Sequence, residues 1–247
     1  MEPLKVVYIN ELFKISKKKK IKAALIFSIL SVIVAAIAVY FLNNFAGIRI
    51  TGSSDFSIMV LTVLSYTLFP LFTAFICIDM FAGEFADDTI KFTLTGPAPR
   101  FKVFSGKILA IAGFIIVNLI FVMILSLIIS IFINGNMTNV LKILLAYIME
   151  FFPQLIFALT VVFISNITRG TTSAFMLSIL IFLLFNGLGF IFPSYKSLFF
   201  TSAFDWYTLI LGGYINFSKI LRVFLILLGY GIMLYTASYY LFEKKEV

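Results

Sequence analysis

The sequence predicts an all-α membrane protein with six transmembrane helices. It also predicts an amphipathic interfacial helix at the amino terminus and short half-inserted external helices between the fifth and sixth spans. Of the 247 residues, 62% are hydrophobic and 12% are charged, whereas soluble domains carry about 25% charged residues. The apolar residues form long continuous runs, and the basic residues cluster beside those runs. Lipid must therefore be the main solvent of this chain.

Six apolar segments reach the length of about 20 residues that a transmembrane helix needs. Because backbone polar groups in hydrocarbon must bond within their own segment, we expect each segment to be helical. The predicted spans are residues 23–42, 57–83, 108–133, 140–165, 174–192 and 220–242. No large polar insertion separates them, so we expect residues 1–247 to form a single transmembrane domain.

Residues 3–16 precede the first span and have the pattern of an amphipathic interfacial helix. Pro3 suits the first position of a helix. Lys5, Glu11 and Lys14 are expected mostly away from the apolar face, which is formed by Leu4, Val7, Tyr8, Leu12 and Ile15. Such a helix lies along a membrane surface, and the lysines at 17–20 would anchor it to anionic lipid.

The distribution of basic residues predicts the orientation of the chain. Fourteen of the nineteen basic residues precede the first span, follow the sixth, or lie in the even-to-odd connections. By the positive-inside rule these regions face the cytoplasm. We therefore expect a multi-pass protein of the plasma membrane with both termini cytoplasmic. The net charge of +8 then indicates an anionic membrane surface as partner rather than nucleic acid.

Residues 193–219, on the predicted external side, are apolar and aromatic but too interrupted for a span. Gly212 and Gly213 break the segment. We expect one or two short helices that dip into the outer leaflet, with their irregular backbone buried in protein. An ordinary interfacial belt of aromatic residues is the alternative interpretation.

The connection between the second and third spans, residues 84–107, holds the densest internal cluster of charge. Glu84, Asp87 and Asp88 have the spacing that shares one helix face, and Pro97 and Pro99 prevent the helix from continuing. The segment, called the elbow below, is predicted to be a helix leaving the membrane, a turn and a returning helix. A solvated connector that only obeys the positive-inside rule is the alternative.

The order of residues in the elbow resembles that of a known family. An acid is followed by a Thr with an aliphatic and a charged neighbour, an apolar run, a Pro-x-x-Arg turn and a Gly-Lys pair. In this chain these are Glu84, Thr89-Ile90-Lys91, residues 92–94, Pro97-Ala98-Pro99-Arg100 and Gly106-Lys107. Together with the six spans and the two interfacial elements, this pattern resembles the membrane subunit of type-2 ABC exporters.

The resemblance implies that the elbow is a coupling helix seated on a separate ATP-binding subunit. The residues implied in that contact are Glu84, Asp87, Asp88, Thr89, Lys91 and Arg100. It also implies two ATP-binding subunits, which would carry ATP and Mg²⁺, and a second permease subunit, identical or paralogous. Asp88 stands where the family usually has Gly, and Ala86 and Pro99 replace its usual acid and Ser. The resemblance alone therefore does not predict a sharp turn at residue 88.

The chain shows no nucleotide-binding or catalytic motif of its own. Gly106-Lys107 matches the end of a phosphate loop, but Phe101 stands where that motif needs Gly. The sequence has no His, which excludes a Ser-His-Asp relay. Acids on one exposed helix face are more typical of a solvated surface than of a metal site, so we expect no metal. We expect a transport subunit that is not an enzyme and binds no cofactor.

Two polar residues stand out inside the predicted fourth span. Glu150 and Gln154 lie one turn apart, and a carboxylate at the middle of a span costs about 2.5–3.5 kcal/mol. Either they line a substrate path or they form a helix–helix hydrogen bond. Pro153 would free a carbonyl one turn earlier and mark a kink. We also expect Pro70 to kink the second span, and Asp79 to snorkel or to pair with Lys107.

Small permeases of this layout resemble exporters of amphipathic peptides, including antimicrobial-peptide immunity systems and phenol-soluble-modulin exporters. Spans rich in Phe fit an apolar or amphipathic cargo. Export of polysaccharide, lipid or drug by the same architecture remains open. The rival classes are an ion-coupled secondary transporter and a non-transporting scaffold. An ion-coupled carrier needs several buried ionisable groups near the midplane, and the sequence offers essentially Glu150 alone.

Overall fold

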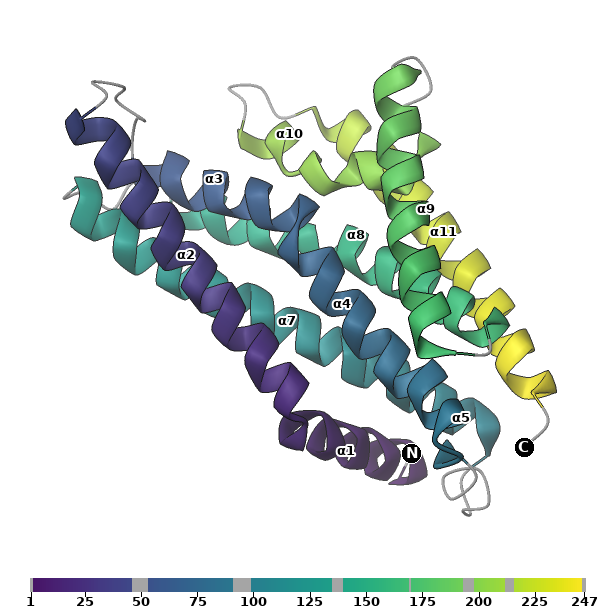
Figure 1. Ribbon diagram of the computed structural model, residues 1–247. Helices are drawn as coiled ribbons and strands as arrows, with labels where there is room; N and C mark the ends of the chain where they lie inside the picture. Colours follow the sequence, from purple (N-terminus) through teal and green to yellow (C-terminus); the bar gives the residue numbers. More distant parts are fainter. Residues whose placement is uncertain are drawn as a thin grey trace.

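The computed structural model describes residues 2–45, 53–90, 99–134, 140–168, 170–192, 198–211 and 216–245, and within them all regular structure is helical (Figure 1). Six helices in these ranges are long and apolar enough to cross a membrane. The predicted all-α membrane fold is confirmed. Lys91 and the Gly212-Gly213 pair lie outside the described residues.

The chain begins with α1 (Glu2–Lys17) and α2 (Lys19–Phe45). The second membrane helix is composite and consists of α3 (Ser53–Tyr66), α4 (Leu68–Ile78), the π-helical turn η1 (Asp79–Gly83) and α5 (Glu84–Ala86). The remaining long helices are α7 (Arg100–Asn134), α8 (Val140–Ile167), α9 (Thr171–Ile191) and α11 (Phe217–Lys244). Two short elements, the 3₁₀ helix η3 (Phe200–Asp205) and α10 (Thr208–Leu211), connect α9 to α11.

The bundle has two distinct ends. The helix α1, the elbow helix α5 and the carboxyl end of α11 lie together at one end, called the basal end (lower end in Figure 1). The elements η3 and α10 lie at the opposite, apical end. The two termini are therefore on the same side, as an even number of spans requires.

The helices α4 and α8 form the centre of the bundle. In the most apolar parts of α8 and of the stretch from Leu68 to Ala86, which begins with α4, 72% of the residues are buried, against 17% for α2 and α9 and 6% for α11. Outward-facing Leu, Ile and Phe side chains cover these three peripheral helices. Lipid tails are as apolar as these side chains, so such a surface is the expected lipid-facing exterior of a membrane bundle.

The second membrane helix is interrupted at Thr67, whose backbone dihedral angles (φ −123°, ψ −85°) are not helical. The cause is Pro70, which has no N–H to donate to Tyr66 and whose ring clashes with the preceding turn. The kink predicted from Pro70 is confirmed. The carbonyl of Ser65, beside the interruption, instead accepts a hydrogen bond from Nε2 of Gln154 on α8 at 3.3 Å.

Pro153 has a different effect, because α8 continues through it as one helix. The carbonyl that Pro153 leaves without its helical donor belongs to Met149. Nε1 of Trp206, next to η3, donates to this oxygen at 3.1 Å. The predicted free carbonyl is therefore present, but an indole from the apical segment satisfies it.

The apical segment lies partly inside the bundle, as expected for half-inserted helices. Phe200, Ala203, Phe204, Trp206 and Tyr207 are all buried. The hydroxyl of Tyr207 also shares a hydrogen bond of 2.7 Å with Thr62 on α3. The segment thus closes the apical end between α3, α8 and α9.

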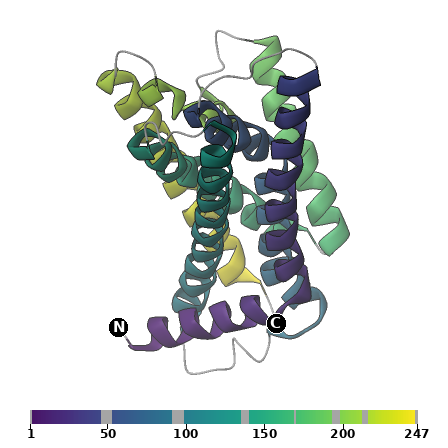
Figure 2. The same ribbon diagram turned by 90° about the vertical axis from the view of Figure 1, so that its left-hand side faces the viewer.

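The helix α1 lies across the base of α2 and α7 (Figure 2). It packs against α7 at two glycines, Gly106 and Gly113, which leave space because they have no side chain. The two are two turns apart on the same face of α7. A Cβ atom at Gly106 would stand 2.6 Å from Cγ1 of Val7, and one at Gly113 would stand 3.3 Å from the hydroxyl of Tyr8. These two glycines let the interfacial helix approach the bundle closely enough to bury Glu11.

Replacing Gly106 by Ala should push α1 away from α7. Overpacking of this kind destabilises proteins by about 1–3 kcal/mol, so the midpoint of thermal unfolding of the purified protein in detergent should fall. The matched control is Gly229→Ala in α11, where a Cβ meets no atom within 4 Å and Ala favours the helix. Equal midpoints for the two variants would contradict the close approach of α1.

Candidate functional site

An unusual helical geometry directly precedes the elbow. The π-helical turn η1 inserts an extra residue into the helical ladder between α4 and α5, and such bulges are frequent at functional sites. The helix then ends at Ala86, and residues 87–89 form a turn. Asp88 has a φ of 54°, the left-handed region that Gly favours. The chain therefore makes the sharp turn there even though the family's Gly is replaced by Asp.

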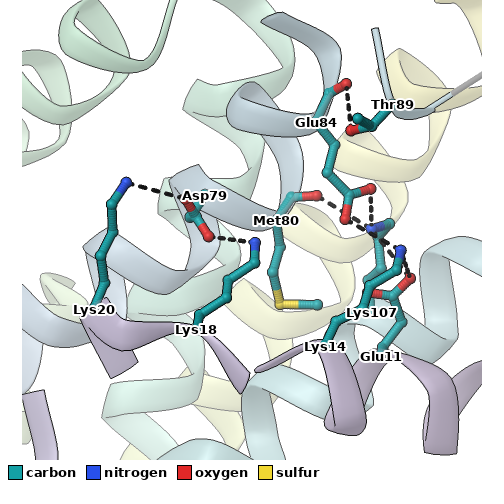
Figure 3. A network of polar contacts seen from close by, with 9 residues as sticks. All are labelled: Glu11, Lys14, Lys18, Lys20, Asp79, Met80, Glu84, Thr89 and Lys107. Carbon is teal, nitrogen blue, oxygen red and sulfur yellow. Dashed lines mark hydrogen bonds and ion pairs between the residues drawn. The ribbon is translucent and has the colours of Figure 1, made fainter. Parts of the chain in front are cut away.

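The side chain of Lys107, at the basal end of α7, is completely buried. Its Nζ lies 2.6 Å from Oε2 of Glu84 and 3.4 Å from Oε1 of Glu11 (Figure 3). It also donates to the carbonyl of Met80 in η1 at 3.3 Å. One ammonium group thus joins the elbow, α7 and α1.

A second lysine completes the cluster. Nζ of Lys14 lies 3.1 Å from Glu11 and 3.4 Å from Glu84. Partial burial lowers the pKa of Lys14, but the carboxylates of Glu11 and Glu84 outweigh that effect and raise its pKa above the ordinary value. Lys14 therefore stays protonated. The two acids and two bases, Glu11, Lys14, Glu84 and Lys107, are called the basal ion network below.

Asp79, the first residue of η1, makes a separate pair of contacts. Its carboxylate bonds to Nζ of Lys18 and lies 3.4 Å from Nζ of Lys20. Lys18 is the residue between α1 and α2, so Asp79 holds the bend between these helices (Figure 3). Of the two alternatives for Asp79, pairing with Lys107 is wrong, because Lys107 is engaged one turn further along with Glu84.

The three acids of the elbow do not share one face. Glu84 is buried, whereas Asp87, Asp88 and Thr89 are exposed. The reason is that the helix ends before Asp87, so the spacing of a continuous helix does not apply. The hydroxyl of Thr89 turns back to the carbonyl of Glu84 at 3.3 Å, which ties the exposed turn to the buried anchor.

Arg100 begins α7 and reaches the carboxyl end of α11. Its Nη1 donates to the carbonyl oxygens of Glu243 and Lys245, which are otherwise unsatisfied at a helix end. Nζ of Lys245 in turn lies 3.9 Å from the ring centroid of Phe85 in the elbow. The carboxyl end of α11 is thereby bound both to the start of α7 and to the elbow helix α5.

An aromatic cluster lies beside the basal ion network. Phe81 of η1, Phe85 of the elbow and Phe104 of α7 surround Phe242 of α11, with ring centroids 5.4–6.1 Å apart. Phe81, Phe104 and Phe242 are fully buried. Aromatic pairs add about 0.5–1.5 kcal/mol each beyond their burial. The elbow is therefore held on one side by ion pairs and on the other by packed rings.

Glu150 and Gln154 lie away from this site, deep between α8 and the interrupted second helix. Both are fully buried. Nε2 of Gln154 donates to Oε1 of Glu150 at 2.9 Å and to the carbonyl of Ser65. Within the described residues, Oε2 of Glu150 has no hydrogen-bond donor. The bond to Ser65 is the helix–helix hydrogen bond of one interpretation, and the substrate path of the other interpretation stays a prediction.

Sequence reasoning missed three members of the basal ion network. Glu11 was placed away from the apolar face of α1, but its side chain is buried there with Ile15. Lys14 was placed only on the polar side of the interfacial helix, and Lys107 was considered only as part of the Gly-Lys pair and as a partner for Asp79. A usable signal was present, because Glu11 and Lys14 have the i, i+3 spacing of a helix pair.

Removing the buried cation should be costly. The substitution Lys107→Met leaves Glu84 buried without its closest partner, and breaking a buried pair costs about 3–5 kcal/mol. Thermal unfolding in detergent should show a large loss for Lys107→Met. The double variant Lys107→Met/Glu84→Gln should recover part of it, because no lone charge remains buried.

The control is Lys102→Met, a partly exposed lysine in the first turn of α7. Away from buried networks, such a change is usually within about 0.5 kcal/mol. If Lys107→Met were no worse than Lys102→Met, the basal ion network would not stabilise the fold.

Comparison with known proteins identifies the family. A sequence model described as "ABC-2 family transporter protein" matches residues 9–189, a range that contains the whole basal ion network. A comparison with curated proteins gives no match. The match covers well over half of the chain and agrees with the six membrane-spanning helices. The chain belongs to the ABC-2 family of transporter proteins and is a membrane-spanning permease subunit of an ABC exporter.

Proposed function

We propose that this permease converts ATP hydrolysis on a separate ATP-binding subunit into outward movement of amphipathic peptides or another apolar cargo. The observation that carries the proposal is the construction of the elbow. Its turn, residues 87–89, is exposed at the basal end, while Glu84 beside it is buried in the basal ion network. The exposed turn, residues 87–89, is called the tip below. Because it stands on a firmly held helix, it is suited to receive a force from a soluble partner.

Within this proposal the coupling residues divide into two groups. Asp87, Asp88 and Thr89 form the surface that contacts the ATP-binding subunit, together with Lys91, which lies outside the described residues. Glu84 and Arg100 act through the elbow, because their side chains bond to Lys107 and to the end of α11. These two are positioning residues that keep the tip at a fixed angle.

The contacts that the elbow makes at the basal end define which helices would move together with the tip. The basal ion network connects the elbow to α1 and α7, and the aromatic cluster connects it to α11. The interruption at Thr67 and the π-helical turn η1 are the points where the second helix departs from α-helical geometry. Such points are where a helix bends, so α4 could change its angle while the base moves as one body.

We further propose the composition of the working assembly. Two ATP-binding subunits would supply ATP and Mg²⁺, and a second permease, identical or paralogous, would complete the path. The basal end would face the cytoplasm, with both termini there, in the plasma membrane. The excess of basic residues at that end supports this orientation.

The choice of cargo rests on the apolar character of the chain, so polysaccharide, lipid and drug remain alternatives within the same mechanism. An ion-coupled carrier is less well supported. Of the buried acids in the described residues, Glu11 and Glu84 belong to the basal ion network and only Glu150 lies deep in the bundle. A carrier that uses an ion gradient needs more ionisable groups at that depth.

A charge reversal at the tip tests the coupling. In a complex purified with its ATP-binding subunit, Asp87→Lys should reduce cargo-stimulated ATP hydrolysis at least tenfold, since like charges brought together across an interface cost several kcal/mol. Asp87 is preferable to Asp88, because its φ of −90° accepts any residue. The unfolding midpoint of the permease should not change.

The matched control is Glu243→Lys, an exposed acid at the basal end of α11. It reverses the same charge at the same end of the bundle but outside the elbow. The proposal fails if Asp87→Lys hydrolyses ATP as well as Glu243→Lys does, or if no ATP-binding subunit purifies with the permease.

A further inference from the structure

A groove of about 340 Å³ runs between the basal parts of α2 and α4. Its floor consists of the buried side chains Ala24, Phe72 and Ile76, and its walls are Phe27 and Phe75, which are 56% and 45% exposed. The volume falls within the range of small-ligand sites. The groove opens toward the side of the bundle, where lipid is the solvent.

The two charged residues that line the groove are Lys20 and Asp79, and both lie at its basal end. Asp79 makes its closer contact with Lys18, so Lys18 already neutralises it. The side chain of Lys20 is 78% exposed and lies 3.4 Å from Asp79. Lys19 and Lys22 are exposed nearby. The basal end of the groove therefore carries a positive excess.

The helix α1 marks the level of the membrane surface. Besides the face that packs on α7, it exposes a second apolar stripe formed by Val6, Ile9 and Phe13. An amphipathic helix with such a stripe lies at the boundary between headgroups and acyl chains. Lys20 lies three residues beyond the end of α1, in the first turn of α2, so its ammonium group stands at headgroup depth and the apolar groove extends into the acyl region.

We propose that this groove binds an anionic phospholipid. One acyl chain lies between Phe27 and Phe75, and Lys20 binds the phosphate of the headgroup. Charge complementarity selects this occupant, because an apolar groove with Lys20 at one end matches a molecule with one anionic end. The proposal concerns lipid alone and stands or falls independently of ATP coupling.

The first test measures lipid retained by the purified permease. The protein is exchanged into nanodiscs of equal parts phosphatidylglycerol and phosphatidylcholine, extracted into detergent, and examined by native mass spectrometry. Phosphatidylglycerol should be retained in preference to phosphatidylcholine. Lys20→Gln should lower its retention about fivefold, the effect of one lysine at an anionic surface. Lys22→Gln, a neighbour outside the groove, should lower it much less.

The second test fills the groove. Ala23→Phe places a ring among the lining residues and should abolish preferential retention, whereas Ala38→Phe, exposed higher on α2, should not. Equal loss with Lys20→Gln and Lys22→Gln would mean a diffuse charge effect and would overturn the proposal. Unchanged retention in Ala23→Phe would overturn it too. A cross-link from Phe27 to a second permease chain would make the groove a subunit interface, with the same consequence.

Discussion

The structure depends on one buried charge. Nζ of Lys107 is fully removed from solvent, and an uncompensated ammonium group in that position would cost several kcal/mol. Glu84 and Glu11 must therefore stay close to it. Because these three residues belong to the elbow, α7 and α1, the requirement to neutralise one charge fixes how three separate segments meet. Gly106, directly before Lys107, gives α1 the space to bring Glu11 there.

This constraint explains why the elbow has one buried part and one exposed part. Glu84 is turned inward as the anchor, and the chain leaves the helix two residues later, so that Asp87 to Thr89 face outward. The aromatic cluster around Phe242 and the bonds from Arg100 add α11 to the same unit. A force applied to the tip would therefore act on the elbow, α1, α7 and α11 together rather than on one loop. Such a lever suits the proposed coupling, in which a bistable bundle is biased from one end.

Much of the fold could be predicted because it depends on local pattern. Runs of apolar residues predicted the six membrane helices, and Pro70 predicted the interruption of the second helix. The pairing of Glu150 with Gln154 was also accessible, since the two are one turn apart on one helix. Each of these features depends on residues close together in the sequence.

The basal site could be predicted only in part, because its contacts join distant segments. Lys14 and Glu84 are 70 residues apart, and Lys107 lies 23 residues beyond Glu84. Two assumptions of regular geometry also failed. The π-helical turn changes the angular position of Glu84, and the early end of the helix removes Asp87 and Asp88 from its face. Sequence spacing alone assumes an unbroken α-helix and could not reveal either change.

The central claim is that α1 and the elbow move as one body, and pulsed electron spin resonance tests it most directly. Spin labels at exposed Asn10 and Ala86 report the distance from α1 to the elbow, and a label at Thr171, at the basal start of α9, gives the reference. The single native cysteine, Cys77, is buried and does not compete for label. In the complex with its ATP-binding subunit, nucleotide should leave the Asn10–Ala86 distance unchanged while the Ala86–Thr171 distance shifts. A change between Asn10 and Ala86 as large as that to Thr171 would contradict the account.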